Sequence, residues 1–240
     1  MKNIILILLL SIVSVFGKNI KVVTEEFKPY NYLKDDKIVG LSTEVVEAVL
    51  KKAKIDYTIT LYPWARAYKS SLKNENILIY SISRTWQRED KFKWVGSIAP
   101  SAGVAFFKLK QRDDIDINNL NDAKKYSMCS LKLDVTTQTL TNKGFNVDIT
   151  YSNDQSIKNL MDKKVDIIPF SINGFYEKIK QLGYSKDNFE KVYDIKSLSN
   201  DYYMAFSVKT DDEIVRKVSK VLEEIKKESF YKQILKKYGF

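Results

Sequence analysis

The strongest constraint on the fold of this 240-residue chain is a repeated alternation of short apolar runs with amphipathic helical patterns. In the first third, β-branched or apolar runs of strand length predict strands at residues 20–24, 57–61 and 77–80. Helical patterns separate them at residues 43–53, with Ser42 or Thr43 as the expected cap, and from Pro63 onward. Strands joined by helices in this order predict a parallel sheet with helices on its faces.

The second half of the chain repeats the alternation. Strands are expected at 127–129, 148–151 and 166–169, and helices at 134–143, 154–163 and 172–182. Further strand candidates lie at 93–96, 104–107, 191–194 and 202–207, before two closing helices at 211–227 and 229–238. We therefore predict an α/β protein of two lobes with a cleft between them. Lobe one comprises residues 18–101 and 201–240, and lobe two residues 102–200.

The first 17 residues form a separate module. Lys2 precedes an apolar run at 4–12, and small residues precede a cleavage point near Gly17. This pattern is typical of a cleavable signal peptide, and the apolar run is shorter than the roughly 20 residues needed to span a bilayer. We expect an exported protein located in the periplasm, without a lipid anchor because no cysteine lies at the cleavage point.

The composition of the chain excludes several classes of function. The chain has no histidine, which excludes histidine-based catalysis and histidine metal sites. Because Cys129 is the single cysteine, an intramolecular disulfide is impossible, and we expect Cys129 to be a buried thiol. The net charge of +10 is spread in lysine pairs over predicted helices, so we expect no nucleic-acid partner. No cofactor or metal site is predicted.

The loops that follow the predicted strands are expected to gather at the ligand cleft, because open α/β sheets bind ligands beyond the carboxyl ends of their strands. These loops are 25–30, 81–88, 131–136 and 170–173. In the second, Ser81, Ser83 and Arg88 would suit a small anion, since hydroxyls donate to it and a guanidinium can hold a carboxylate with two parallel bonds. A solvated polar loop is the alternative.

Five segments together resemble the family 3 extracellular solute-binding proteins of polar amino-acid ABC transporters. They are TEEFKPY at 24–30, GLSTE at 40–44, YSISRTWQRE at 80–89, YMAFS at 203–207 and FYKQILKKY at 230–238. The resemblance covers essentially the whole chain after residue 17. It implies a type II periplasmic-binding-protein fold, in which each lobe is a mostly parallel sheet flanked by helices.

The resemblance also implies roles for residues of lobe one. Phe27 and Trp64 match the two aromatic side chains that sandwich the ligand, although plain core packing is the alternative for both. Ser81 and Ser83 match the donors to the ligand carboxylate, and Arg88 matches the arginine that clamps it. Arg66 is similar to an arginine that faces the cleft in a subgroup of the family; an exposed helical arginine is the alternative.

Lobe two departs from the family pattern. Lys132 and Asp134 lie where the family has a glycine followed by Thr or Ser, and an alternative register places Thr136 and its neighbours 137–138 there instead. Ser171 lies where amino-acid binders carry an aspartate for the α-ammonium group. Either Asp134, Glu25 or Glu26 takes that role, or the ligand has no α-ammonium group.

These features predict a monomeric binding protein that closes around a small carboxylate-bearing solute, an amino acid or a related compound, and presents it to an ABC permease in the inner membrane. Hinge motion is expected near residues 99–104 and 198–203. Two alternatives stay open: a sensory binding protein that docks on a receptor, and an enzyme similar to cyclohexadienyl dehydratases, which would need a carboxylic acid of raised pKa in the cleft.

Overall fold

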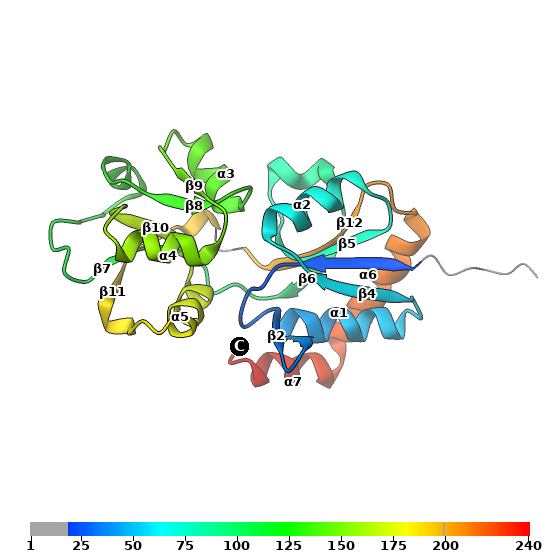
Figure 1. The fold of residues 1–240 in the computed structure, drawn as a ribbon. Coiled ribbons are helices and arrows are strands. Elements are labelled where there is room, and N and C mark those ends of the chain that lie inside the picture. The colour runs from blue at the N-terminus through cyan, green and yellow to red at the C-terminus, as the bar shows by residue number, and fades with distance from the viewer. Residues whose placement is uncertain (1–18, 199) are drawn as a thin grey trace, which may run out of the picture.

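Two α/β lobes lie side by side in the computed structural model, which describes residues 19–198 and 200–240 (Figure 1). Lobe one is built on a five-stranded sheet of order β4-β1-β5-β12-β6. Its strands are β1 Ile20–Thr24, β4 Tyr57–Leu61, β5 Ile77–Ser83, β6 Phe92–Ala99 and β12 Tyr202–Ser207. β1 runs parallel to β4 and β5, whereas β12 runs antiparallel to β5 and β6.

Helices cover both faces of this sheet because its strands are apolar on both sides. Val22 packs with α1 Leu41–Lys52, α6 Asp212–Lys227 and α7 Ser229–Lys237, whereas its neighbour Val23 packs with α2 Trp64–Lys73 on the opposite face. The alternation of side chains along a strand places these two valines on different faces. The result is a three-layer lobe with its strand ends directed at the neighbouring lobe (Figure 1).

Lobe two has a three-stranded sheet of order β10-β7-β11 and a parallel pair, β8 with β9. The strands are β7 Val104–Leu109, β8 Cys129–Leu131, β9 Asp148–Thr150, β10 Ile167–Ser171 and β11 Phe189–Asp194. A single parallel bridge between Met128 and Ile167 joins the two sheets. α3 Val135–Asn142 packs on one side, and α4 Asn153–Met161 and α5 Ile172–Gln181 on the other.

Short 3-10 helices complete the two lobes. They are η1 Trp86–Lys91 in lobe one, and η2 Leu120–Lys125, η3 Lys186–Asn188 and η4 Lys196–Leu198 in lobe two. A small hairpin of β2 Tyr32–Lys34 and β3 Lys37–Val39, which the sequence did not predict, lies before α1.

The α/β, two-lobed prediction is confirmed, with two corrections. The sheet of lobe one is mixed and the three-stranded sheet of lobe two is antiparallel, rather than mostly parallel, because β12 and β7 each pair antiparallel with both of their neighbours. The expected Ser42 or Thr43 cap of the first helix is wrong, since Gly40 is the cap residue and no side chain caps α1. Gly40 has a φ of 125°, and a Cβ there would lie 2.4 Å from the Tyr30 carbonyl oxygen.

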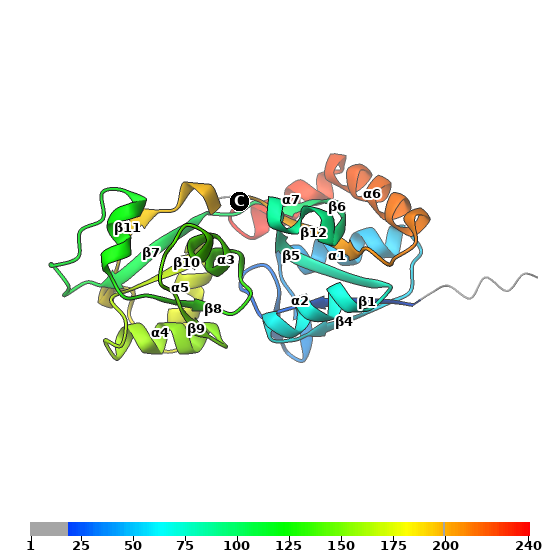
Figure 2. The ribbon, with the colours of Figure 1, turned by 90° about the horizontal axis from the view of Figure 1, so that it is seen from above.

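The chain passes between the lobes twice (Figure 2). The first passage, residues 100–103, links β6 to β7, and Tyr30 Oη donates to the Pro100 carbonyl oxygen there at 3.0 Å. The second links η4 to β12 and includes residue 199, which lies outside the described residues. The predicted signal peptide, residues 1–17, also lies outside them. Among the described helices, none is long and apolar enough to cross a membrane.

Candidate functional site

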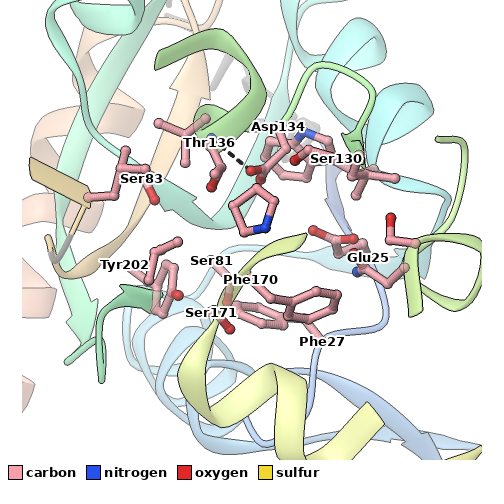
Figure 3. A pocket seen from close by; sticks show the side chains of 18 of the residues that line it. Glu25, Phe27, Ser81, Ser83, Ser130, Asp134, Thr136, Phe170, Ser171 and Tyr202 are labelled. Atoms are coloured by element: carbon pink, nitrogen blue, oxygen red, sulfur yellow. Dashed lines mark hydrogen bonds between the residues drawn. The ribbon is translucent and has the colours of Figure 1, made fainter. Parts of the chain in front are cut away.

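A cavity of about 70 Å³ lies between the lobes, at the ends of the strands (Figure 3). A cavity needs roughly 10–15 Å³ to hold one water molecule, so this one is on the scale of a small solute. Both lobes line it. Of the predicted ligand-binding residues, eight lie on its wall: Phe27, Trp64, Ser81, Ser83, Arg88, Asp134, Thr136 and Ser171.

Arg88 is the buried cation of the cavity, with only 1% of its surface exposed. One terminal nitrogen donates to the Ser83 carbonyl oxygen at 3.2 Å and the other to the Leu133 carbonyl oxygen at 3.1 Å. Its Nε is buried and has no hydrogen-bond partner among the described residues. Burial lowers the pKa of the guanidinium, and the charge of Asp134 opposes that effect. A charge this deeply buried without an ion pair is costly, so a ligand anion would stabilise it.

Trp64 and Arg88 connect the lobes through one main-chain atom. Trp64 Nε1 donates to the same Leu133 carbonyl oxygen at 2.9 Å, and the Arg88 guanidinium lies 5.5 Å from the Trp64 ring centre. Leu133 itself has a φ of 63°, in the left-handed region, and packs against the apolar cluster beneath α2. Two side chains of lobe one therefore hold the tip of lobe two, and the cleft is closed in this structure.

A β-bulge at Ser81 shapes the lobe-one wall. Ile82 pairs with Tyr203 and Tyr80 with Met204, so Ser81 is the extra residue, and its φ is 57°. Leu78 and Tyr80 face one core, and the bulge shifts the alternation so that Ile82 joins the opposite core with Ile79. Bulges re-aim side chains next to functional sites. Here the bulge brings Ser81 to the cavity wall.

The bulge also positions the loop that carries Glu25. Ser81 Oγ donates to the side-chain oxygen of Asn31, and Asn31 in turn donates from its amide nitrogen to the Glu25 carbonyl oxygen. Asn31 is fully buried and also pairs with Phe27 through main-chain bonds. The hydroxyl of Ser81 thus has a role that the sequence did not predict: it fixes the loop that carries the glutamate.

Glu25 lines the cavity, whereas its neighbour Glu26 does not. Burial, together with the negative charge of Asp134, raises the pKa of Glu25 to about 8, and Lys178 and Arg88 act in the opposite direction. A carboxyl group in this environment carries a proton at neutral pH unless a cation joins it. Glu26 is exposed and accepts a hydrogen bond from Gln181 at 3.3 Å.

Lobe two meets the cavity with the N-termini of its three helices. Asp134 caps α3 and accepts from the Thr136 N–H at 2.8 Å, and Ser171 caps α5 and accepts from the Gly174 N–H at 3.2 Å. The start of α4 contributes Asn153 to the wall. Two alternative alignments of this lobe with the family were proposed, at 132–134 and at 136–138. Each contributes one residue to the cavity wall, Asp134 from the first and Thr136 from the second.

Aromatic rings close one side of the cavity. Phe27 packs edge-on against Tyr202, with 5.4 Å between ring centres, and reaches α5 of lobe two at Gly174. A Cβ on Gly174 would lie 2.7 Å from Phe27 Cε2, so this helix can approach the ring only because residue 174 has no side chain. Burial raises the pKa of Tyr202 to about 12, which keeps its hydroxyl protonated.

Two of the predicted residues lie outside the cavity wall. Arg66 is exposed and stacks on the Tyr62 ring, 4.1 Å from its centre. Lys132 lies over the Tyr151 ring, with Nζ 4.9 Å from the centre. The structure does not bring either of them to the other predicted residues.

The cavity also contains residues that the sequence did not single out. Besides Glu25, which was one of several candidates, Ser130, Phe170 and Tyr202 line it (Figure 3). Tyr202 opens the return strand that the sequence did predict, so its position at the end of that strand was an available signal. Among the described residues, no group of three or more His, Cys, Asp or Glu side chains could hold a metal ion.

Two lobes joined by two crossings, with a charged cavity enclosed between them, define a protein that binds a small solute by closing over it. Comparison with known families agrees. Residues 20–240 match the model of the bacterial extracellular solute-binding proteins, family 3, so the chain belongs to that family.

Individual relatives are distant. The chain is 22% identical to a probable histidine-binding protein of Campylobacter jejuni over 88% of its length and 81% of the relative. It is 26% identical to the L-cystine-binding protein TcyA of Bacillus subtilis, over 88% of the chain and 77% of the relative. Among solved structures, an ancestral arginine-binding protein bound to arginine superposes with a TM-score of 0.78 at 19% identity, covering 92% of this chain and 98% of the other.

Proposed function

We propose that this protein captures a small carboxylate-bearing solute, an amino acid or a related compound, and delivers it to an ABC permease in the inner membrane. The observation that carries the proposal is Arg88, a buried cation at a closed inter-lobe cavity whose Nε has no protein partner among the described residues. A ligand carboxylate at that position would receive charge-assisted hydrogen bonds. The histidine- and cystine-binding relatives support an amino-acid ligand.

The proposal includes a cellular setting and a motion. We infer that residues 1–17 are removed on export, with cleavage near Gly17, and that the mature protein works as a monomer in the periplasm. We place the lobe boundaries at 18–101, 102–200 and 201–240, so that rotation occurs where the chain crosses between the sheets. Opening would break the bonds of Trp64 and Arg88 to the Leu133 carbonyl oxygen and admit the solute.

A ligand screen tests this function. Thermal unfolding of the purified protein should be measured with each of the twenty L-amino acids, L-cystine, dicarboxylates and short peptides. We expect at least one to raise the unfolding temperature in a concentration-dependent way, because a ligand that binds only the folded state stabilises it by mass action. No shift with any carboxylate would remove the proposed solute class. Permease partnership is tested separately, by ligand-dependent stimulation of ATP hydrolysis by a purified amino-acid ABC transporter of the source organism.

One observation favours a second candidate function. The raised pKa of Glu25 gives the cavity a protonated carboxyl group at neutral pH, which is the group that acid catalysis of the dehydratase type requires. Incubation with prephenate or arogenate distinguishes the two functions. Formation of the aromatic product, lost in Glu25→Gln, would assign catalysis; binding of amino acids without turnover would assign capture.

A further inference from the structure

Two carboxyl groups reach the cavity from opposite lobes. Glu25 lies on the loop after β1, and Asp134 lies at the start of α3; both side chains point into the cavity (Figure 3). Neither forms a salt bridge with any described residue. Lys178, the lysine whose charge acts on Glu25, pairs instead with Asp154 at 3.1 Å. Neither carboxyl group of the cavity therefore has a salt-bridge partner among the described residues.

The charges of the cavity wall favour a ligand that brings its own cation. Its charged residues are Arg88, Glu25 and Asp134. The raised pKa of Glu25 keeps it protonated in the ligand-free site at neutral pH, so Arg88 and Asp134 balance each other there. A simple carboxylate that pairs with Arg88 would leave Asp134 without a cation, whereas a zwitterion also brings an ammonium group to Asp134. Buried charges are stable only when paired, so the wall discriminates against an anion that lacks an ammonium group.

Neither Ser171 nor Glu26 is suited to hold an ammonium group in this cavity. Ser171 is neutral, and its hydroxyl oxygen already accepts from the Gly174 N–H. Asp134 accepts from the Thr136 N–H through one oxygen only, and its second oxygen is available. Glu26 is outside the cavity wall. An ammonium group has three donors and can bind oxygens of both Glu25 and Asp134 at once.

We propose that Glu25 and Asp134 together hold the ammonium group of an amino-acid ligand whose carboxylate is bound by Arg88. This rests on the proposed solute-binding function and specifies its substrate class. Because the two acids belong to different lobes, the ammonium group joins lobe one to lobe two. It also removes the repulsion between two carboxylates that closure brings together.

The pairing makes binding depend on pH. The groups that face Glu25 are Asp134 on α3, Lys178 on α5, Arg88 on η1 and Tyr202 on β12. Tyr202 stays neutral below about pH 12. An ammonium group beside Glu25 favours its ionised form, so binding releases a proton wherever the ligand-free carboxyl is protonated. Affinity should then rise with pH, by up to roughly tenfold per unit, until about pH 8.

The experiment compares each L-amino acid that binds with its des-amino carboxylic acid, by isothermal titration calorimetry on the purified protein. L-Glutamine with 4-carbamoylbutyrate and L-histidine with imidazole-4-propionate are such pairs. We expect the des-amino partner to bind at least about 100-fold more weakly, since it cannot form the charge-assisted hydrogen bonds of the ammonium group. The preference should fall about tenfold or more in Glu25→Gln and in Asp134→Asn.

The variants are chosen to preserve the fold. Glutamine has the shape of glutamate, and asparagine caps helices as well as aspartate does, so α3 keeps its cap. Glu26→Gln is the matched control, because it removes a neighbouring charge outside the cavity wall and should leave both affinities unchanged. The pH profile from 5.5 to 8 should rise in the wild type and become flat in Glu25→Gln.

The outcomes separate the two proposals. Equal binding of an amino acid and its des-amino partner, or binding of dicarboxylates alone, overturns the ammonium site and leaves the solute-binding function in place. A flat wild-type pH profile with unchanged affinity in Glu25→Gln removes Glu25 from the ligand and also overturns it. Absence of any binding by carboxylates overturns both.

Discussion

The two lobes build their halves of the site by different means. Lobe one uses the ends of strands: a bulge at Ser81, a loop held by Asn31, and a buried arginine fixed by main-chain carbonyls. Lobe two uses the starts of helices, where Asp134 and Ser171 serve at once as caps and as cavity wall. Ser81 and the loop that carries Glu25 are thus held by hydrogen bonds within lobe one, whereas Asp134 and Ser171 of lobe two line the cavity and also cap their own helices.

Because of this difference, ligand binding can be changed without loss of folding stability more easily in lobe one than in lobe two. Substitutions in lobe one that spare its core should change binding with little effect on folding. Substitution of a capping residue in lobe two, Asp134 or Ser171, would also remove a hydrogen bond that stabilises a helix, which typically contributes about 1 kcal/mol. Four changes test how far this contrast extends.

The largest effect is expected for Arg88→Ala. It removes the only cation among the described residues of the cavity wall and leaves the Leu133 carbonyl oxygen with one donor fewer. Truncation of one partner of a buried charge pair costs roughly 2–5 kcal/mol, so ligand affinity measured by calorimetry should fall at least about 30-fold. Arg66→Ala is the control, because Arg66 is exposed on Tyr62 and its loss should not alter affinity. Equal losses in both would mean that general surface charge, rather than the cavity arginine, attracts the ligand.

A smaller effect is expected for Gly174→Ala, because α5 packs closely against Phe27 at Gly174. The new methyl group would lie 2.6 Å from Ser171 Oγ and 2.7 Å from Phe27 Cε2, so full closure needs a shift of the ring or of the helix. We expect about tenfold weaker binding with unchanged or higher unfolding temperature, because alanine is the better helix former by roughly 1 kcal/mol. Lys180→Ala, exposed on the same helix, is the control. Wild-type affinity in Gly174→Ala would show that closure tolerates the methyl group.

Trp64→Phe tests the bond that joins the lobes. A smaller aromatic ring replaces the indole, and the N–H that donates to the Leu133 carbonyl oxygen is lost. One hydrogen bond contributes about 1 kcal/mol, so affinity should fall roughly fivefold. Trp86→Phe provides the matched control, since Trp86 is 80% exposed and lies outside the cavity wall. If the two variants bind alike, the Trp64 contact contributes nothing to closure.

The smallest effect concerns the pH dependence of stability without ligand. The pKa of Glu25 is raised to about 8 from its ordinary value of 4.5, so between these values the folded protein binds more protons than the unfolded chain. Its free energy of unfolding should therefore fall as the pH rises from about 4.5 to 8. Opening of the cleft would rehydrate Glu25 and limit the loss, which we expect to lower the unfolding temperature by about 2–6 °C. In Glu25→Gln this slope should be shallower; identical slopes would place the pH dependence on other groups.

Much of the architecture could be predicted because it depends on local patterns. The alternation of strands and helices follows from apolar periodicity, and the family resemblance pointed to Ser81, Ser83 and Arg88 on the cavity wall. The antiparallel pairing of β12 was harder, since a single strand candidate does not reveal its direction in a sheet.

The missed features depend on contacts that leave no local signal. The bulge at Ser81 lies in a run that is apolar on both faces, so a shift of one residue does not alter the visible pattern. The acceptor for Trp64 and Arg88 is a main-chain oxygen, which every residue possesses. The choice between Glu25 and Glu26 depends on how Asn31 holds their loop, which is decided about fifty residues away at Ser81.

The convergence of two lobe-one side chains on the Leu133 carbonyl has an evolutionary consequence. Because the acceptor belongs to the main chain, a change of side chain at position 133 does not delete it, and the lobes retain a common anchor as the sequence drifts. The adjacent residue, Asp134, lies on the cavity wall, and a substitution there would not remove this acceptor either. Ligand specificity could therefore change during evolution through substitutions beside Leu133, while the closing motion of the lobes is retained.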